Sequence, residues 1–166
     1  MSLDNIQLPP VAIQGLFKKS LVELKSSLAA AQISTPSTLN ILGKNLRRTI
    51  VLVNNTEAAF LQDDELNFLL GILSACKLNM DDVGILNIAK NTTADYNMIA
   101  AELNAEKIFL FGIETSDIKL PLSFPNYQVQ HYNNQIYLSA PPLSNLQHDK
   151  AEKTKLWNCL KQIFSI

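Results

Sequence analysis

The sequence predicts an α/β fold in which helices cover both faces of a mostly parallel sheet. Apolar runs rich in β-branched and aromatic residues alternate along the chain with amphipathic segments. These runs are continuous rather than alternating, which is typical of strands buried on both faces. Their order is strand–helix–strand–helix–strand, followed by a strand pair and a last helix, and it favours crossover connections between parallel strands.

The chain has 166 residues, which fits one domain with a shorter appended segment. We assign residues 1–47 to an N-terminal segment with a helix and residues 48–166 to a single α/β domain. Pro10 suits the first turn of an amphipathic helix predicted over residues 11–32. The apolar stripe of this helix consists of Leu16, Phe17, Leu21, Leu24 and Leu28.

The first half of the α/β domain contains two predicted strands, over residues 49–55 and 83–89. A helix is predicted between them over residues 64–77, with Asp63 as its cap. Four leucines at helical spacing indicate the buried face of this helix: Leu66, Leu69, Leu70 and Leu73.

The second half continues with a short helix predicted over residues 95–103 and a strand over residues 107–113. The dipeptide Asn133-Asn134 separates two short strands and predicts a hairpin turn. A last helix begins after an Asp149 cap. Its predicted buried residues are Leu156, Trp157, Leu160 and Phe164.

In sheets of this kind, ligands bind beyond the carboxyl ends of the parallel strands. Three segments are expected at that edge, namely residues 54–57, 87–91 and 139–143. The last of them reads Ser-Ala-Pro-Pro-Leu and forms a rigid elbow. Its two prolines fix the backbone direction, and neither has a backbone N–H to donate. The elbow therefore occupies the expected site but offers little chemistry, and Leu143 and Leu146 are expected to pack under the last helix.

Two of these segments resemble the uracil-DNA glycosylase superfamily. The stretch from Leu69 to Asn91 leads from a helix through a short turn to a strand that ends in Asn87-x-x-Lys90, and the elbow precedes a terminal helix. The resemblance runs from about Ile50 to Ile163 and implies a three-layer sandwich with a mostly parallel four-stranded sheet. It also implies that Asn87 matches the Asn that reads the pyrimidine edge. The alternative is that Asn87 is a polar residue at a strand end whose hydrogen bonds are made within the protein.

The chain departs from the glycosylase pattern at the residues that carry the chemistry. The loop after the first strand lacks the glycines and proline of the family's water-activating motif, although Asn54, Asn55 and Glu57 could still orient a water molecule. Ser139 or Ala140 stands where the family has a catalytic His, and neither can stabilise a departing base anion as an imidazole does. We therefore predict a degenerate pocket formed by Asn54, Asn55, Glu57, Asn87, Ser139, Ala140 and Pro141.

The psi subunit of bacterial DNA polymerase III is similar to a glycosylase that has lost its catalytic residues. Residues 139–146 and 155–164 resemble the elbow and the following Leu-Trp helix of psi more closely than they resemble the elbow and terminal helix of the glycosylases. This resemblance implies a non-catalytic subunit that links the clamp loader to other replication proteins. It also implies a partner-binding N-terminal segment, for which the candidates are Ile6, Leu8, Val11, Leu16 and Phe17.

Two alternatives stay open. One is a divergent glycosylase superfamily enzyme that acts on damaged DNA bases, with Glu57 or Asn55 orienting water. The other is an unrelated α/β binding domain. The missing His, the missing glycines and the balanced charge favour the interaction subunit over the enzyme.

Composition restricts the remaining function classes. The formal net charge of −1 gives no basic footprint for nucleic acid, so tight direct DNA binding is not expected. With five glycines and no phosphate-binding motif, and with two cysteines and two histidines in unrelated segments, no cofactor or metal is expected. No apolar run approaches the roughly 18 residues of a membrane span, and no signal peptide is evident, so a cytoplasmic protein is expected.

Overall fold

The computed structural model describes residues 39–166, which belong to one compact unit. The predicted helix over residues 11–32 and the five candidate partner-binding residues lie outside this described range. The elements in chain order are β1 (Ile41–Leu42), β2 (Thr49–Val53), α2 (Asp63–Ala75), β3 (Val83–Asn87), η2 (Ile88–Lys90), α3 (Tyr96–Leu103), β4 (Lys107–Phe111), η3 (Thr115–Ile118), β5 (Val129–Tyr132), β6 (Gln135–Ala140), α4 (Leu143–His148) and α5 (Lys150–Phe164).

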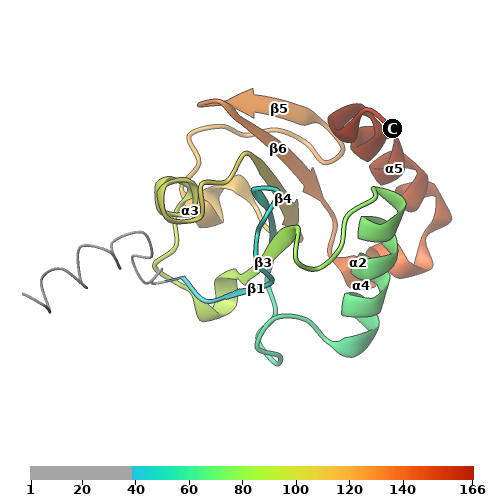
Figure 1. Cartoon of the computed structure of the whole chain (residues 1–166), viewed down its shortest axis with the longest axis horizontal. Helices are drawn as coiled ribbons and strands as arrows, with labels where there is room; N and C mark the ends of the chain where they lie inside the picture. The colour runs from blue at the N-terminus through green and yellow to red at the C-terminus, as the bar shows by residue number, and fades with distance from the viewer. Residues whose placement is uncertain (1–38) are drawn as a thin grey trace, which may run out of the picture. The chain divides into compact units, whose positions relative to one another are not determined.

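The elements form a mixed α/β domain around one sheet (Figure 1). The strand order is β1-β3-β2-β4-β6-β5. The four central strands are mutually parallel, and β1 and β5 add antiparallel strands at the two edges. The sheet therefore has six strands rather than the four that the resemblance implied. β5 joins the sheet through a hairpin with β6, a connection that antiparallel strands allow, whereas β1 pairs with β3, which follows only after β2 and α2.

Helices cover both faces of the sheet, as the continuous apolar strands predicted. On one face, alternate residues of the central strands pack against α2, α4 and α5. On the other face, the intervening residues pack against α3 and η3. Figure 1 shows α2, α4 and α5 on one side of the strands and α3 on the other. Each central strand is thus buried on both sides, which explains why its sequence shows no polar alternation.

The predicted hairpin is confirmed. Antiparallel strands β5 and β6 are joined by Asn133 and Asn134, whose φ angles are 51° and 61°. Two consecutive residues with positive φ are required by a type I′ turn, and Asn tolerates that conformation better than most residues. The Asp149 cap is confirmed as well, because its carboxylate accepts the backbone N–H groups of Ala151 and Glu152 at 2.8 and 3.1 Å.

The α/β domain includes residues that the sequence analysis assigned to the N-terminal segment. β1 pairs with β3, and the backbone N–H groups of residues 45–47 donate to carbonyls of residues 81–83 at 2.9–3.1 Å. Leu39 is buried in the core beneath α3. Gly43 has a φ of 106° between these contacts, where a Cβ would lie 2.2 Å from the Val83 carbonyl oxygen. The domain therefore reaches back to at least Leu39.

Within residues 39–166, none of the helices has the length and apolar character needed to cross a membrane.

Candidate functional site

The candidate site lies where the four parallel strands end. Val53 of β2 is aligned with Asn87 of β3 and with Phe111 of β4, and Phe111 is aligned with Ala140 of β6. The segments that follow these residues therefore start at the same edge of the sheet. The three segments predicted to meet there are brought together by this register.

Asn87 is fully buried, and its amide group is occupied by the loop that follows β2. Its Oδ1 accepts the backbone N–H groups of Asn55 and Ala89 at 3.0 and 3.1 Å. Its Nδ2 donates to the carbonyls of Asn55, Ala58 and Ala59 at 2.7, 3.2 and 3.1 Å. Both ends of the amide are committed to backbone groups, so none of its hydrogen-bonding capacity is left for a base.

Asn55 organises the same loop from within. Its Oδ1 accepts the backbone N–H groups of Glu57 and Ala58, each at 2.9 Å, and its Nδ2 donates to the carboxylate of Glu65 at 3.3 Å. This is the turn that Asn side chains commonly make with the backbone two or three residues ahead. The polar residues of this loop therefore build its conformation.

Glu57, the candidate for activating water, is exposed. Its carboxylate accepts a hydrogen bond from Gln62 Nε2 at 3.0 Å, just ahead of α2. Lys90 donates to the carbonyl of Thr56 at 2.8 Å, which ties the loop to η2. Glu57 is therefore exposed to solvent, on a loop whose backbone is held by the buried Asn87 amide.

The two candidates for the position of the missing His lie on opposite faces of the sheet. Ala140 belongs to the core under α2, α4 and α5, on the same face as Val53 and Phe111. Ser139 faces the other way, as alternation along a strand requires, and its hydroxyl donates to Asn126 Oδ1 at 2.8 Å. Of the two, only Ala140 shares a face with Val53 and Phe111, and it brings only a methyl group.

The elbow is packed against the end of β4. The backbone N–H of Gly112 donates to the Ala140 carbonyl at 2.9 Å, and a Cβ on Gly112 would lie 2.7 Å from Pro142 Cγ. Pro142 precedes α4, a short helix that the sequence analysis did not predict. Leu143 and Leu146 of this helix are buried in the same core as Leu156 and Leu160 of α5, which confirms their packing under the last helix.

Little space remains between these groups. The cavity at the strand ends measures about 20 Å³, and its lining includes Asn54, Asn55, Glu65, Phe111 and Pro142. A volume of this size holds about one water molecule, whereas ligand pockets usually measure roughly 300–1,000 Å³. Of the predicted pocket residues, Asn54 and Asn55 line this cavity, and Ser139 borders a different hollow of about 530 Å³ beside Asn126. The other four, Glu57, Asn87, Ala140 and Pro141, line neither.

No cluster of three or more His, Cys, Asp or Glu side chains suited to a metal ion occurs within residues 39–166. Cys76 and Cys159 are both buried and free. Burial raises the pKa of the Cys76 thiol to about 11, and burial also raises the pKa of Cys159. Both thiols therefore stay protonated near neutral pH and behave as small apolar core residues.

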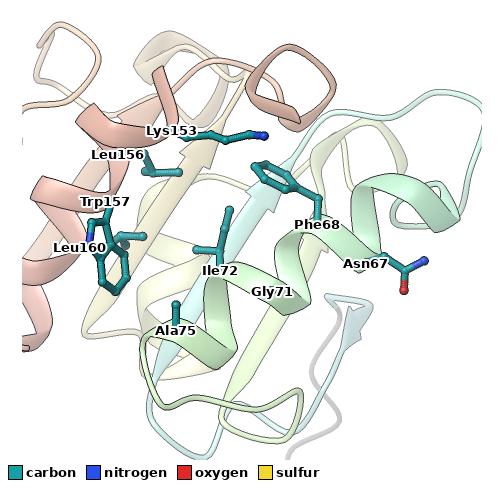
Figure 2. Close-up of a pocket in the computed structure, with 9 residues that line it drawn as sticks. All are labelled: Asn67, Phe68, Gly71, Ile72, Ala75, Lys153, Leu156, Trp157 and Leu160. Carbon is teal, nitrogen blue, oxygen red and sulfur yellow. The ribbon is translucent and has the colours of Figure 1, made fainter. Parts of the chain in front are cut away.

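A larger hollow lies elsewhere, between α2 and α5 (Figure 2). We call it the helix groove. It has a volume of about 410 Å³ and is lined by Asn67, Phe68, Gly71, Ile72, Ala75, Lys153, Leu156, Trp157 and Leu160. The groove was not predicted from the sequence, because the leucine pattern indicates one apolar face of α2 and Trp157 was predicted to be buried. Phe68 and Ile72 are spaced i and i+4 beside that face, and this spacing was the sequence signal for a second apolar surface on α2.

The basic residues next to β1 and β2 are paired with carboxylates. Lys44 lies 2.8 Å from Asp81, Arg47 lies 3.8 Å from Asp82, and Arg48 lies 2.7 Å from Glu106, measured between the charged atoms. The basic side chain of each pair is exposed, whereas the Asp82 side chain is only 15% exposed. This cluster is therefore locally neutralised and does not form a free cationic patch.

Comparison with known proteins gives no assignment. No family model matches the chain, and no curated protein matches it. The functional interpretation therefore depends on the geometry described above.

Proposed function

We propose that this protein is a non-catalytic interaction subunit of the DNA replication machinery, similar to the psi subunit of DNA polymerase III and with a uracil-DNA glycosylase-like fold. The main support is the closed site at the ends of the parallel strands. The Asn87 amide is bound to backbone groups on both sides, and the remaining cavity is about 20 Å³. The space beside Asn54 and Asn55 is therefore too small for a base.

Base excision needs more than this edge provides. An enzyme that acts on a DNA base must hold the base in a pocket outside the stack, and it must stabilise the charge that develops on the leaving group. Here the pocket is filled by the loop of Asn55 and by Pro142, and Ala140 offers no donor. Four parallel strands with helices on both faces support the glycosylase-like architecture, and the filled edge supports the loss of its chemistry.

The charge distribution favours protein partners over DNA. Proteins bind DNA tightly through many Lys and Arg contacts to phosphate. The chain has 14 basic and 15 acidic residues, and the arginines next to β2 are engaged by Asp82 and Glu106. We therefore propose that the protein contacts the clamp loader or other replisome proteins and does not itself bind DNA tightly.

The intact chain should capture the purified clamp-loader complex of its own organism through the N-terminal segment. Changing Ile6 and Leu8 together to Asp is expected to weaken capture by at least about tenfold, because two apolar contacts are replaced by charges. The control changes Asn5 and Gln7 to Asp, which adds the same charges and removes no apolar side chain. Biolayer interferometry measures the affinity, and the melting temperature should match wild type in both variants. Wild-type protein that does not bind the complex would contradict the proposal.

The protein is also expected to excise no uracil from single- or double-stranded DNA. Losing one preorganised charge stabiliser typically costs ~2.7–4 kcal/mol in a transition state, and the water-binding loop is altered here as well. Excess protein is incubated with labelled uracil-containing DNA, and abasic sites are then cleaved with alkali. Product that forms with wild type and disappears with Glu57→Ala would instead establish the divergent glycosylase.

A further inference from the structure

We propose that the helix groove between α2 and α5 binds an amphipathic helix of a protein partner, with an acidic side chain of that helix next to Lys153. This inference rests on the proposed role as an interaction subunit, and it assigns a binding surface to the α/β domain itself. This surface is lined by other residues than the closed edge of the sheet.

The lining of the groove is suited to apolar side chains. Phe68 and Ile72 of α2 and Trp157 of α5 are each only partly buried, and Leu156 and Leu160 form the base. A small polar ligand would need several convergent polar groups to orient it. Apart from the indole N–H of Trp157, the polar groups of the lining belong to Asn67 and Lys153, and Figure 2 shows Asn67 directed away from the other lining side chains.

Gly71 gives a second reason to expect a helix. It lies inside α2, where Gly is about 0.5–1 kcal/mol less favourable than Ala. Its conformation does not require Gly, and a Cβ at this position would meet nothing within 4 Å. Ala75 lies one turn further along the same side of the groove. These small residues leave room for another backbone to approach α2 between the larger side chains, as happens where helices pack closely.

Lys153 supplies the charge that defines the partner. Its Nζ lies 5.3 Å from the centroid of the Phe68 ring, at the rim of the groove. It forms no ion pair with any carboxylate of residues 39–166. The neighbouring Glu152 is already engaged, because Lys155 donates to it at 2.7 Å and the Tyr127 hydroxyl also donates to it. These hydrogen bonds lower the pKa of Glu152, so it remains a carboxylate bound to Lys155.

The same charge argues against a second copy of the chain in the groove. A two-fold dimer brings the same patch of both subunits together. The lining of the groove carries Lys153 and no carboxylate, so the same patch of a second copy offers this Lys no opposite charge. A partner helix with a carboxylate at its edge has the complementary charge.

The test uses the full chain and the fluorescence of Trp157, because the chain has 1 Trp and it lines the groove. The probes are two designed helical peptides of about 18 residues, or five turns, that share Leu at positions i, i+3, i+4 and i+7. One carries Glu along the edge of the Leu stripe and the other carries Lys. The Glu-edged peptide should shift the Trp157 emission to the blue in a saturable manner. It should bind at least about tenfold more tightly than the Lys-edged peptide.

Two variants make the result specific to the groove. Gly71→Gln fills it with a good helix former and should weaken binding of the Glu-edged peptide by at least about tenfold. Ser74→Gln adds the same side chain to an exposed position of α2 outside the groove, and should bind as wild type does. Lys153→Glu should reverse the preference between the two peptides.

Several results would overturn the proposal. The proposal is wrong if neither peptide shifts the emission up to millimolar concentration, or if Gly71→Gln binds the Glu-edged peptide as wild type does. A wild-type dimer in sedimentation that Gly71→Gln dissociates would assign the groove to a second copy. An emission maximum that is already blue in the free chain and moves to the red in Gly71→Gln would assign it to residues outside the described part. Capture of the clamp loader by Gly71→Gln is measured in parallel. This measurement distinguishes failure of the groove proposal from failure of the proposed function.

Discussion

Replacing Asn87 by Ala is expected to lower the free energy of unfolding by about 3–4 kcal/mol, one of the largest effects of any single polar substitution in this domain. The side chain is fully buried and makes five hydrogen bonds to backbone groups. Alanine leaves those backbone donors and acceptors at a buried strand end without their partner. Each unsatisfied buried group costs about 1–3 kcal/mol, although water can reach some of them when the loop relaxes.

Urea unfolding followed by circular dichroism measures this effect. Asn54→Ala is the matched control, because Asn54 is exposed in the same loop and its replacement should change stability by less than about 0.5 kcal/mol. Asn87→Asp should also destabilise, since a carboxylate cannot donate to the three carbonyls that Nδ2 now serves. A loss below about 1 kcal/mol in Asn87→Ala would mean that the loop holds its conformation without this amide.

The central strands could be predicted from the sequence because their signal is local. β2, β3 and β4 are each short, continuous apolar runs, and strands buried on both faces require that pattern. The turn at Asn133 and Asn134 was predictable for the same reason, because two residues that tolerate positive φ are needed there.

Elements that depend on distant contacts could not be predicted in this way. β1 has two residues, and it is defined by pairing with β3 and by hydrogen bonds to residues 81–83. α4 follows two prolines, and its six residues carry no periodic signal of their own. Two buried leucines and the packing under α5 determine it instead.

The candidate site shows the same limit. The sequence indicated that Asn87 and Asn55 would meet at one edge, because parallel strands in register end together. It did not show whether the Asn87 amide faced a ligand or the backbone, since either partner satisfies an Asn. Alternation along β6 could have separated Ser139 from Ala140 before the structure was known, because neighbouring residues of a strand face opposite sides. The helix groove was missed because a helix with two apolar faces needs a second neighbour, and sequence periodicity does not identify that neighbour.

Replacing Gly112 by Ala is expected to lower the free energy of unfolding by about 2–4 kcal/mol, for two separable reasons. Gly112 has a φ of 66°, a left-handed conformation that costs a residue with a Cβ roughly 1–2 kcal/mol. The added Cβ would also lie 2.7, 3.1 and 3.2 Å from Cγ, Cβ and Cα of Pro142. Overpacking of this kind typically costs about 1–3 kcal/mol, and the elbow would have to move away from β4 to relieve it.

A double-mutant cycle with Pro142→Ala separates the two contributions, because alanine removes Cγ and with it the shortest contact. The double variant should therefore recover about 1 kcal/mol relative to the sum of the single variants, and the part due to φ should remain. Gly71→Ala is the control for the substitution itself. It lies in open space inside α2 and should raise stability by about 0.5–1 kcal/mol. Denaturant midpoints of the four proteins measure this coupling. If the cycle shows none, the elbow does not strain the end of β4, and the closed edge of the sheet is held by the loop contacts of Asn87 and Asn55.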